Sequence, residues 1–184
     1  EFVPEWSTVI AGEKLAEVLQ KLQNPEEASP PENLRATLRP YQRQGFAWLK
    51  FMTHMGLGAC LADDMGLGKT VQVIALLLAK KADEGVRAPA LLIVPASLIG
   101  NWKAEVAKFA PDLRLFIAHP SQTDRETLAL AATHPAEALR GFDVMLTTYQ
   151  FLQKTDLWLS HAWSMVILDE AQAIKNSGSS SAKA

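Results

Sequence analysis

The stretch with the clearest chemical potential is "DDMGLGKT" at positions 63–70. Its Gly66 and Gly68 are followed directly by Lys69 and Thr70, at the start of an apolar run that is typical of a helix. Backbone N–H groups of such a turn converge on an anion at the helix N-terminus. The lysine can reach the β- and γ-phosphates of a nucleotide, and the threonine hydroxyl can join the shell of Mg²⁺. The pattern predicts a phosphate-binding loop, although the usual pattern begins with glycine rather than aspartate. The alternative is a glycine-rich turn without a ligand.

A second set of chemically capable residues follows the apolar run "SMVIL" at positions 164–168. If this run is a buried strand, it brings Asp169 to the carboxyl edge of a sheet, where a carboxylate can hold hydrated Mg²⁺. Glu170 is then placed to polarise the water that attacks the γ-phosphate. The alternative is an acidic first turn of a helix, which is common. Two halves of one site at the ends of two buried strands favour nucleotide hydrolysis.

The elements that must position these residues alternate along the chain. Short apolar runs predict strands over 58–62, 90–95, 113–118, 143–148 and 164–169, and the segments between them predict helices over 38–52, 70–82, 98–109 and 124–132. Continuous apolar strands separated by helices are typical of a parallel sheet that is covered on both faces. The sequence therefore predicts an α/β fold in which a parallel sheet is sandwiched by helices.

Length and composition fit one such domain with a short appendage. The chain has 184 residues, and its 48% apolar and 21% charged content is an ordinary globular balance. Residues 13–22 predict one amphipathic helix, and residues 24–33 form an acidic, proline-rich linker. We therefore assign 1–33 to an N-terminal appendage and 34–184 to the main domain. Since the sequence starts with Glu-Phe and not with Met, we expect a processed or excised piece.

The composition also limits the class of partner. The formal net charge is −2, so no overall basic excess indicates nucleic acid, although a local patch can still bind phosphates. One cysteine and four scattered histidines provide neither a disulfide framework nor a zinc-ligand spacing. No apolar run approaches the ~18 residues that a membrane span needs. We expect an intracellular protein without a membrane partner.

In their order along the chain, these segments resemble the first motor lobe of the Swi/Snf-type ATPases, within helicase superfamily two. "LRPYQRQGFAWL" resembles the adenine-recognition segment that opens this lobe, and "LADDMGLGKT" resembles its phosphate loop, in which an acidic pair commonly precedes Met-Gly-Leu-Gly-Lys-Thr. Asp63 is then a family variant of the loop. The resemblance implies a RecA-like P-loop NTPase lobe that uses ATP and Mg²⁺. It implies nucleotide contacts from Gln42, Met65, Gly66, Leu67, Gly68, Lys69 and Thr70, metal contacts from Thr70 and Asp169, and catalytic roles for Lys69, Asp169 and Glu170.

Three further segments resemble motifs of the same lobe, namely "LLIVPASLIGNW", "MLTTYQFL" and "DEAQAIKN". The last is similar to a DEAH-like box with Gln172 where histidine is commoner, which leaves open how nucleotide and DNA are coupled. The resemblance implies a track for double-stranded DNA lined by Ser97, Asn101, Trp102, Thr147, Thr148 and Lys175. The alternatives are that Trp102 packs in the core, that the small polar residues cap helices, and that Lys175 is a solvated charge.

The resemblance also implies parts of the lobe that this sequence does not hold. In relatives a further strand follows the acidic box, and it lies between the strand of the phosphate loop and the strand of the box. A second RecA-like lobe then supplies an arginine finger, which is typically worth roughly 10³ to 10⁵ in rate. We therefore expect a sheet that is incomplete at the C-terminus and weak ATP turnover by this chain alone.

Three functions follow from these observations. The first is the ATP-binding lobe of a DNA-dependent ATPase that translocates on duplex DNA or remodels protein–DNA complexes, in the nucleoid or the nucleus. The second is a different P-loop NTPase that DNA does not stimulate. The third is a nucleotide- or DNA-binding fragment with little turnover. Stimulation of hydrolysis by DNA separates the first from the second, and nucleotide binding without hydrolysis would favour the third.

Overall fold

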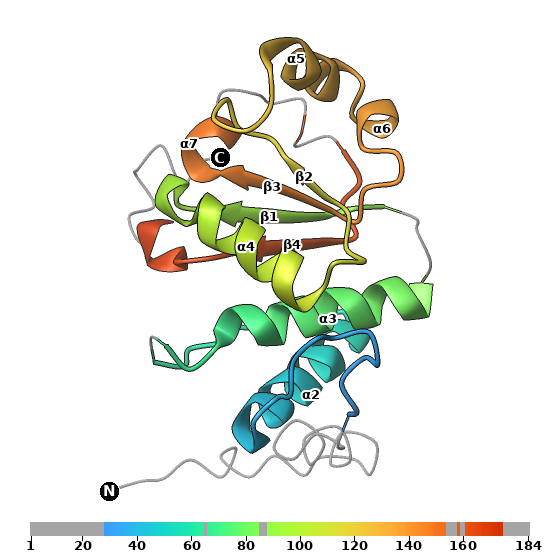
Figure 1. Cartoon of the computed structure of the whole chain (residues 1–184), viewed down its shortest axis with the longest axis vertical. Coiled ribbons are helices and arrows are strands. Elements are labelled where there is room, and N and C mark those ends of the chain that lie inside the picture. Colours follow the sequence, from blue (N-terminus) through green and yellow to red (C-terminus); the bar gives the residue numbers. More distant parts are fainter. Residues whose placement is uncertain (1–27, 65, 85–87, 154–157, 159–160, 175–184) are drawn as a thin grey trace, which may run out of the picture.

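The computed structural model describes residues 28–64, 66–84, 88–153, 158 and 161–174. Its centre is a four-stranded parallel sheet in the order β2-β3-β1-β4 (Figure 1). The strands are β1 (Ala90–Val94), β2 (Leu115–Ile117), β3 (Val144–Thr148) and β4 (Met165–Leu168). The predicted α/β class, with a parallel sheet between helices, is confirmed. The helix predicted over 13–22 lies outside the described residues.

β1 is a central strand, and its register fixes where the segments after the strands lie. Leu92 stands opposite Leu146 of β3 and Ile167 of β4, and β3 pairs in turn with β2. Because all these pairings are parallel, the carboxyl ends of the strands share one edge of the sheet. The segments that follow β1, β3 and β4 carry many of the candidate site residues, and they meet at this edge.

Side chains of the strands alternate between two apolar clusters on opposite faces of the sheet. In β1, Ala90, Leu92 and Val94 belong to the first cluster, and Leu91 and Ile93 belong to the second. All five are buried. A parallel strand that is covered by helices on both faces needs such a continuous apolar sequence.

Three helices contribute to the first cluster, namely α2 (Pro40–His54), α3 (Lys69–Glu84) and α4 (Ile99–Phe109), and α2 lies on the far side of α3 from the sheet (Figure 1). α2 begins at a proline, whose fixed φ suits the first turn of a helix. α3 packs against both α2 and α4, which explains why its sequence is apolar on most sides (Figure 1). All three predicted helices are confirmed, with ends within two residues of the prediction.

The second face is covered by α5 (Arg125–Thr133), α6 (Pro135–Ala138) and α7 (Tyr149–Leu152). Asp124 caps α5 by accepting a hydrogen bond from the backbone N–H of Thr127 at 2.8 Å. The hydrogen bonds from Thr127 hold the pKa of Asp124 below its ordinary value. Two short 3₁₀ turns, η2 (Ala96–Leu98) and η4 (Ala171–Ile174), follow β1 and β4. None of the described helices is both long enough and apolar enough to cross a membrane.

One predicted strand is wrong. Residues 58–62 adopt no regular secondary structure, and Leu57 and Cys60 beside or within this segment are exposed. A strand needs a neighbour to complete its hydrogen-bond ladder. Both sides of β1 are occupied by β3 and β4, and β4 ends the described sheet on its side. The segment before the glycine loop is apolar enough for a strand but pairs with no strand among the described residues.

The outer position of β4 is also visible in its side chains. Met165 and Ile167 pack against the first apolar cluster, whereas Val166 and Leu168 are 55% and 41% exposed. β4 therefore alternates between covered and uncovered residues, unlike β1 and β3, whose residues are all buried. β2, at the other edge, is shorter than the predicted 113–118.

Candidate nucleotide-binding site

The glycine loop lies on the side of the molecule toward which the carboxyl ends of the strands point (Figure 1). It leads into the N-terminus of α3, and Figure 1 shows this end of α3 on the same side as the carboxyl ends of the strands. Gly66 and Gly68 have φ values of 84° and 76°, a left-handed conformation that glycine adopts at little cost. The predicted turn into a helix N-terminus, which presents backbone N–H groups to an anion, is therefore present. Met65 lies outside the described residues.

Gln42 joins the predicted adenine-reading segment to this loop. Its side chain is buried, its Nε2 donates to the carbonyl oxygen of Leu67 at 2.9 Å, and its Oε1 accepts from the backbone N–H of Arg39 at 2.9 Å. Tyr41 also donates its hydroxyl to Leu67 O, at 3.2 Å. One amide N–H and one oxygen lone pair of Gln42 have no partner among these bonds. A donor and an acceptor side by side match the N7 and N6 groups of adenine.

Lys69 is folded back onto its own loop. Its Nζ donates to the carbonyl oxygens of Asp63 and Asp64, at 2.6 and 3.0 Å. Backbone carbonyls are neutral acceptors, whereas a phosphate oxygen is charged and forms a stronger bond with an ammonium. The two carbonyls therefore hold the lysine where a phosphate can replace them. The sequence reasoning missed this role of the acidic pair, because the main chain and not the carboxylates provides it.

Gln72 is a second amide near the loop that the sequence analysis did not single out. It is 0% exposed, its Nε2 lies 3.4 Å from Asp63 Oδ2 and from Gly68 O, and its Oε1 has no hydrogen-bond partner. A Cβ added at Gly45 would lie 2.0 Å from this oxygen. The glycine on α2 therefore allows α3 to place an amide behind the loop. The one polar residue within the apolar run 71–79 was the available signal.

Asp169, which follows β4, is held by hydrogen bonds from α4 and α7, the helices on opposite faces of the sheet. Trp102 Nε1 donates to Asp169 Oδ2 at 2.7 Å, and the backbone N–H of Glu170 donates to Oδ1 at 3.0 Å. In the main chain, Asp169 N donates to Ile93 O at 2.9 Å, and the Tyr149 hydroxyl donates to Asp169 O at 2.8 Å. Burial, with the charges of Asp169 and Glu170 nearby, raises the pKa of Tyr149 to about 12.

Glu170, the predicted general base, is the one described non-glycine residue with a positive φ, at 51°. An L-residue in this left-handed region carries strain, which persists only where the surroundings enforce it and often marks a functional site. The Gln172 amide donates to the Glu170 carboxylate. The glutamine that replaces the commoner histidine is therefore in contact with the predicted base.

The oxygen donors suit Mg²⁺. The predicted ligands are the hydroxyl of Thr70 and the carboxylate of Asp169, and hydroxyl and carboxylate oxygens are what this hard cation prefers. Among the described residues, no group of three or more His, Cys, Asp or Glu could hold a metal alone.

The residues predicted for a DNA track divide into two groups. Ser97 and Asn101 are exposed at the end of β1 and the start of α4. Trp102, Thr147 and Thr148 are 3%, 0% and 2% exposed. The two threonines bond inward: Thr147 donates its hydroxyl to Ala118 O at 2.9 Å, and Thr148 caps α7 by accepting from Phe151 N at 3.1 Å. The packing alternative thus describes Trp102 and the capping alternative describes Thr148, whereas Thr147 caps no helix and bonds to the segment after β2. Lys175 lies outside the described residues.

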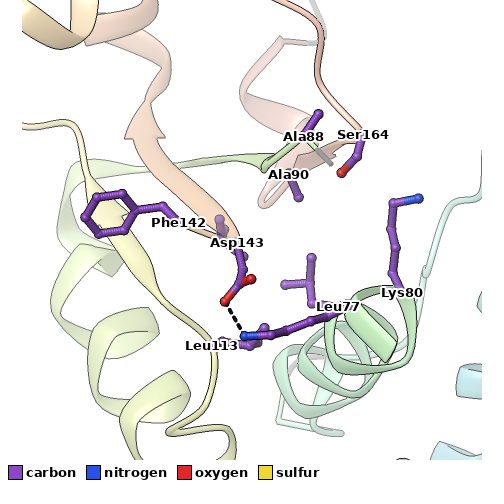
Figure 2. A pocket seen from close by; sticks show the side chains of 10 residues that line it. Leu77, Lys80, Ala88, Ala90, Leu113, Phe142, Asp143 and Ser164 are labelled. Atoms are coloured by element: carbon purple, nitrogen blue, oxygen red, sulfur yellow. Dashed lines mark hydrogen bonds and ion pairs between the residues drawn. The ribbon is translucent and has the colours of Figure 1, made fainter. Parts of the chain in front are cut away.

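A pocket lies at the opposite edge of the sheet, around the start of β1 and β3 (Figure 2). Lys81 reaches across it from α3 and forms a 2.8 Å ion pair with Asp143, and Lys81 Nζ also donates to Asp112 O. Asp143 further accepts from the backbone N–H of Arg114 at 2.7 Å. The bonds of Lys81 and Asp143 connect the C-terminal part of α3 to the segments before β2 and β3. The residues that line the pocket include none from the glycine loop.

Comparison with known proteins agrees with this geometry. The family model for the SNF2-related domain matches residues 41–184. The Bacillus subtilis protein YwqA, named as a candidate ATP-dependent helicase/translocase, is 39% identical over 93% of this chain. The chromatin-remodeling ATPase INO80 of Arabidopsis thaliana is 36% identical over 81% of it. The structure of the Sulfolobus solfataricus SWI2/SNF2 ATPase core in complex with dsDNA is similar over 86% of this chain, with a TM-score of 0.74 and 40% sequence identity.

The chain spans only part of each of these proteins. It covers 18% of YwqA, 10% of the Arabidopsis INO80 and 31% of the Sulfolobus chain.

Proposed function

This chain belongs to the family of SNF2-related domains, and we propose that it is the ATP-binding first lobe of an enzyme that couples ATP hydrolysis to movement along duplex DNA. The observation that carries the nucleotide part is the 2.9 Å hydrogen bond from Gln42 to the carbonyl of Leu67. It joins the segment expected to read adenine to the loop expected to bind phosphate. This contact supports a single nucleotide site built from two separate stretches of sequence.

The residues of the chain divide the chemistry between them. Lys69 exchanges its two loop carbonyls for β- and γ-phosphate oxygens, and the glycine loop offers backbone N–H groups to the same phosphates. Thr70 and Asp169 would hold Mg²⁺, which when bound would neutralise phosphate charge. Glu170 orients the attacking water and accepts its proton.

The DNA part rests on the family and on the exposed residues at the same edge. The Sulfolobus ATPase core, which is 40% identical to this chain, has a structure in complex with dsDNA. In this chain Ser97 and Asn101 are exposed beside the carboxyl edge of the sheet and can donate to phosphate oxygens. Such contacts fix position on DNA without reading its sequence. We place the protein where DNA is, in the nucleoid or the nucleus.

The test is ATP hydrolysis by the intact protein, measured with and without duplex DNA beside the variants Lys69→Ala and Glu170→Gln. We expect turnover that rises with DNA and falls at least about 100-fold in each variant, because one loses a phosphate contact and the other the base. Equal turnover with and without DNA would replace the translocase by a generic NTPase.

The 184-residue chain is assayed in parallel. We expect it to bind Mg²⁺·ATP and to turn over roughly 10³-fold more slowly than a protein in which a second lobe supplies an arginine finger. Turnover as fast as that of the intact protein would show that the chain needs no second lobe. Failure of the chain to bind any nucleotide would reject the nucleotide site itself.

A further inference from the structure

Asp169 is fixed by hydrogen bonds on every polar atom. Each carboxylate oxygen accepts one bond, from Trp102 Nε1 at 2.7 Å and from Glu170 N at 3.0 Å. Its backbone N–H donates to Ile93 O, and its backbone carbonyl accepts from Tyr149. A carboxylate side chain on an exposed turn would ordinarily populate several rotamers. Here the position of the carboxylate is set before any cation binds.

The two side chains in this set come from opposite faces of the sheet. Trp102 lies on α4 within the first apolar cluster, and Tyr149 lies on α7 within the second. Both are buried, and the only polar atom of each side chain donates to Asp169. A packing role needs no polar atom, so packing alone does not account for the hydrogen bonds of these two side chains. The choice of tryptophan and tyrosine is therefore explained by the bonds.

These bonds leave the carboxylate able to bind a cation. Both donors are uncharged, so they orient Asp169 without cancelling its negative charge. Each carboxylate oxygen has further lone-pair sites beyond the one bond that it accepts. Groups that hold a metal ligand in this way raise metal affinity, and their removal typically costs about 10- to 100-fold.

We propose that Trp102 and Tyr149 are positioning residues for magnesium: Trp102 fixes the carboxylate of Asp169 and Tyr149 fixes its main chain, so that Mg²⁺ binds an oriented ligand. The inference rests on the proposed nucleotide site. It gives Trp102 a role inside the protein, in place of the DNA contact that the family resemblance implied.

The test compares Trp102→Phe and Tyr149→Phe with Trp163→Phe in the 184-residue chain. Trp163 is a matched control, because its indole N–H donates to a backbone carbonyl, Trp158 O at 2.9 Å, and not to Asp169. Binding of a fluorescent ADP analogue is measured in EDTA and then over a Mg²⁺ titration. We expect Trp102→Phe to raise the half-saturating Mg²⁺ concentration about tenfold. Tyr149→Phe should raise it less, because its bond is to the main chain. Trp163→Phe and the EDTA affinities should stay within about twofold of wild type.

The outcomes separate this inference from the function beneath it. If wild type binds the analogue with a clear Mg²⁺ dependence and Trp102→Phe shifts it less than twofold, the positioning role is rejected while the nucleotide site stands. If wild type binds no nucleotide, or binds without regard to Mg²⁺, both are rejected. A general structural defect would weaken binding in EDTA as well and would likewise reject a specific positioning role.

A measurement on the unaltered chain covers the case in which Trp102→Phe does not fold. The indole N–H resonances of Trp102 and Trp163 are followed by NMR while Mg²⁺ is added to the ADP complex. Because only Trp102 donates to the carboxylate, its resonance should move and that of Trp163 should not. If the chemical shift of the Trp102 indole N–H does not change when Mg²⁺ is added, the proposal is overturned.

Discussion

The amide of Gln42 lies directly against Gly68: a Cβ on this glycine would come within 2.4 Å of Gln42 Nε2. Gly68 also has a φ of 76°, so any other residue there would be strained as well as crowded. Glycine is therefore required at position 68 for two reasons, namely its left-handed conformation and the close approach of α2. The segments proposed to read the base and to bind phosphate cannot move apart without breaking the Gln42–Leu67 bond.

Gln42 should determine the preference for adenine. Its free N–H and free lone pair form a donor–acceptor pair, and a bidentate contact of this kind is worth about 1–3 kcal/mol. We expect Gln42→Ala to reduce the preference for ATP over GTP by about 10- to 100-fold, measured by competition binding. Gln42→Glu should reduce it as well, because a carboxylate lacks the donor. An unchanged preference in Gln42→Ala would assign Gln42 to supporting the loop alone.

Gly45 should matter for the loop although it lies on α2. In Gly45→Ala the new methyl group forces Gln72 Oε1 away from its present position, at 2.0 Å from the Cβ. Since Gln72 is fully buried, the adjustment should cost about 1–2 kcal/mol of unfolding free energy and weaken ATP binding. Gly100→Ala is the control, because nothing lies within 4 Å of its added Cβ. That change should be neutral or stabilise the chain by up to about 0.5 kcal/mol.

A double-variant cycle locates the cause of the Gly45 effect. If the clash is with Gln72, then Gly45→Ala should cost less in a Gln72→Ala background, measured by denaturant unfolding. An equal loss of unfolding free energy in the two backgrounds would mean that the methyl group clashes with atoms other than those of Gln72.

The Tyr149 hydroxyl should lose its proton at a higher pH than an ordinary tyrosine does. With its pKa at about 12 in the folded state and 10.0 as its ordinary value, the unfolded chain releases this proton first. The stability that the protonated hydroxyl contributes is thus complete below pH 10 and is lost as the pH rises toward 12. Tyrosinate absorbance, taken as wild type minus Tyr149→Phe, should show the transition at about 12. A midpoint near 10 would mean that the hydroxyl does not lie beside Asp169 and Glu170.

Glu170 should carry conformational strain that glycine relieves. At a φ of 51° we expect Glu170→Gly to raise the free energy of unfolding by about 1 kcal/mol while abolishing hydrolysis. Glu170→Gln removes the base but keeps the strain, so it should abolish hydrolysis without this gain. Denaturant unfolding of the two variants separates the effects, and equal stability would show that position 170 is unstrained.

The sequence by itself determined the elements whose signals are local. The helices over 40–54, 69–84, 99–109 and 125–133 and the strands after residue 90 follow from apolar periodicity, which is read within a few residues. The glycine loop and the adjacent carboxylates Asp169 and Glu170 were likewise identified from contiguous residues. The chemistry expected of them depends on residue types at fixed spacing, which the sequence shows directly.

Only the tertiary structure decided which residues meet. The run 58–62 has strand composition, yet it forms no strand, because pairing depends on a neighbour and not on the run itself. Trp102 precedes Asp169 by 67 residues, and its hydrogen bond exists only because α4 packs beside β4 at the carboxyl edge. Local signals cannot encode such a contact, since the approach of two distant segments is set by how the whole sheet and its covering helices pack. The sequence therefore determined the parts of the proposed nucleotide site, and the fold decided that a buried tryptophan would hold the carboxylate predicted to bind magnesium.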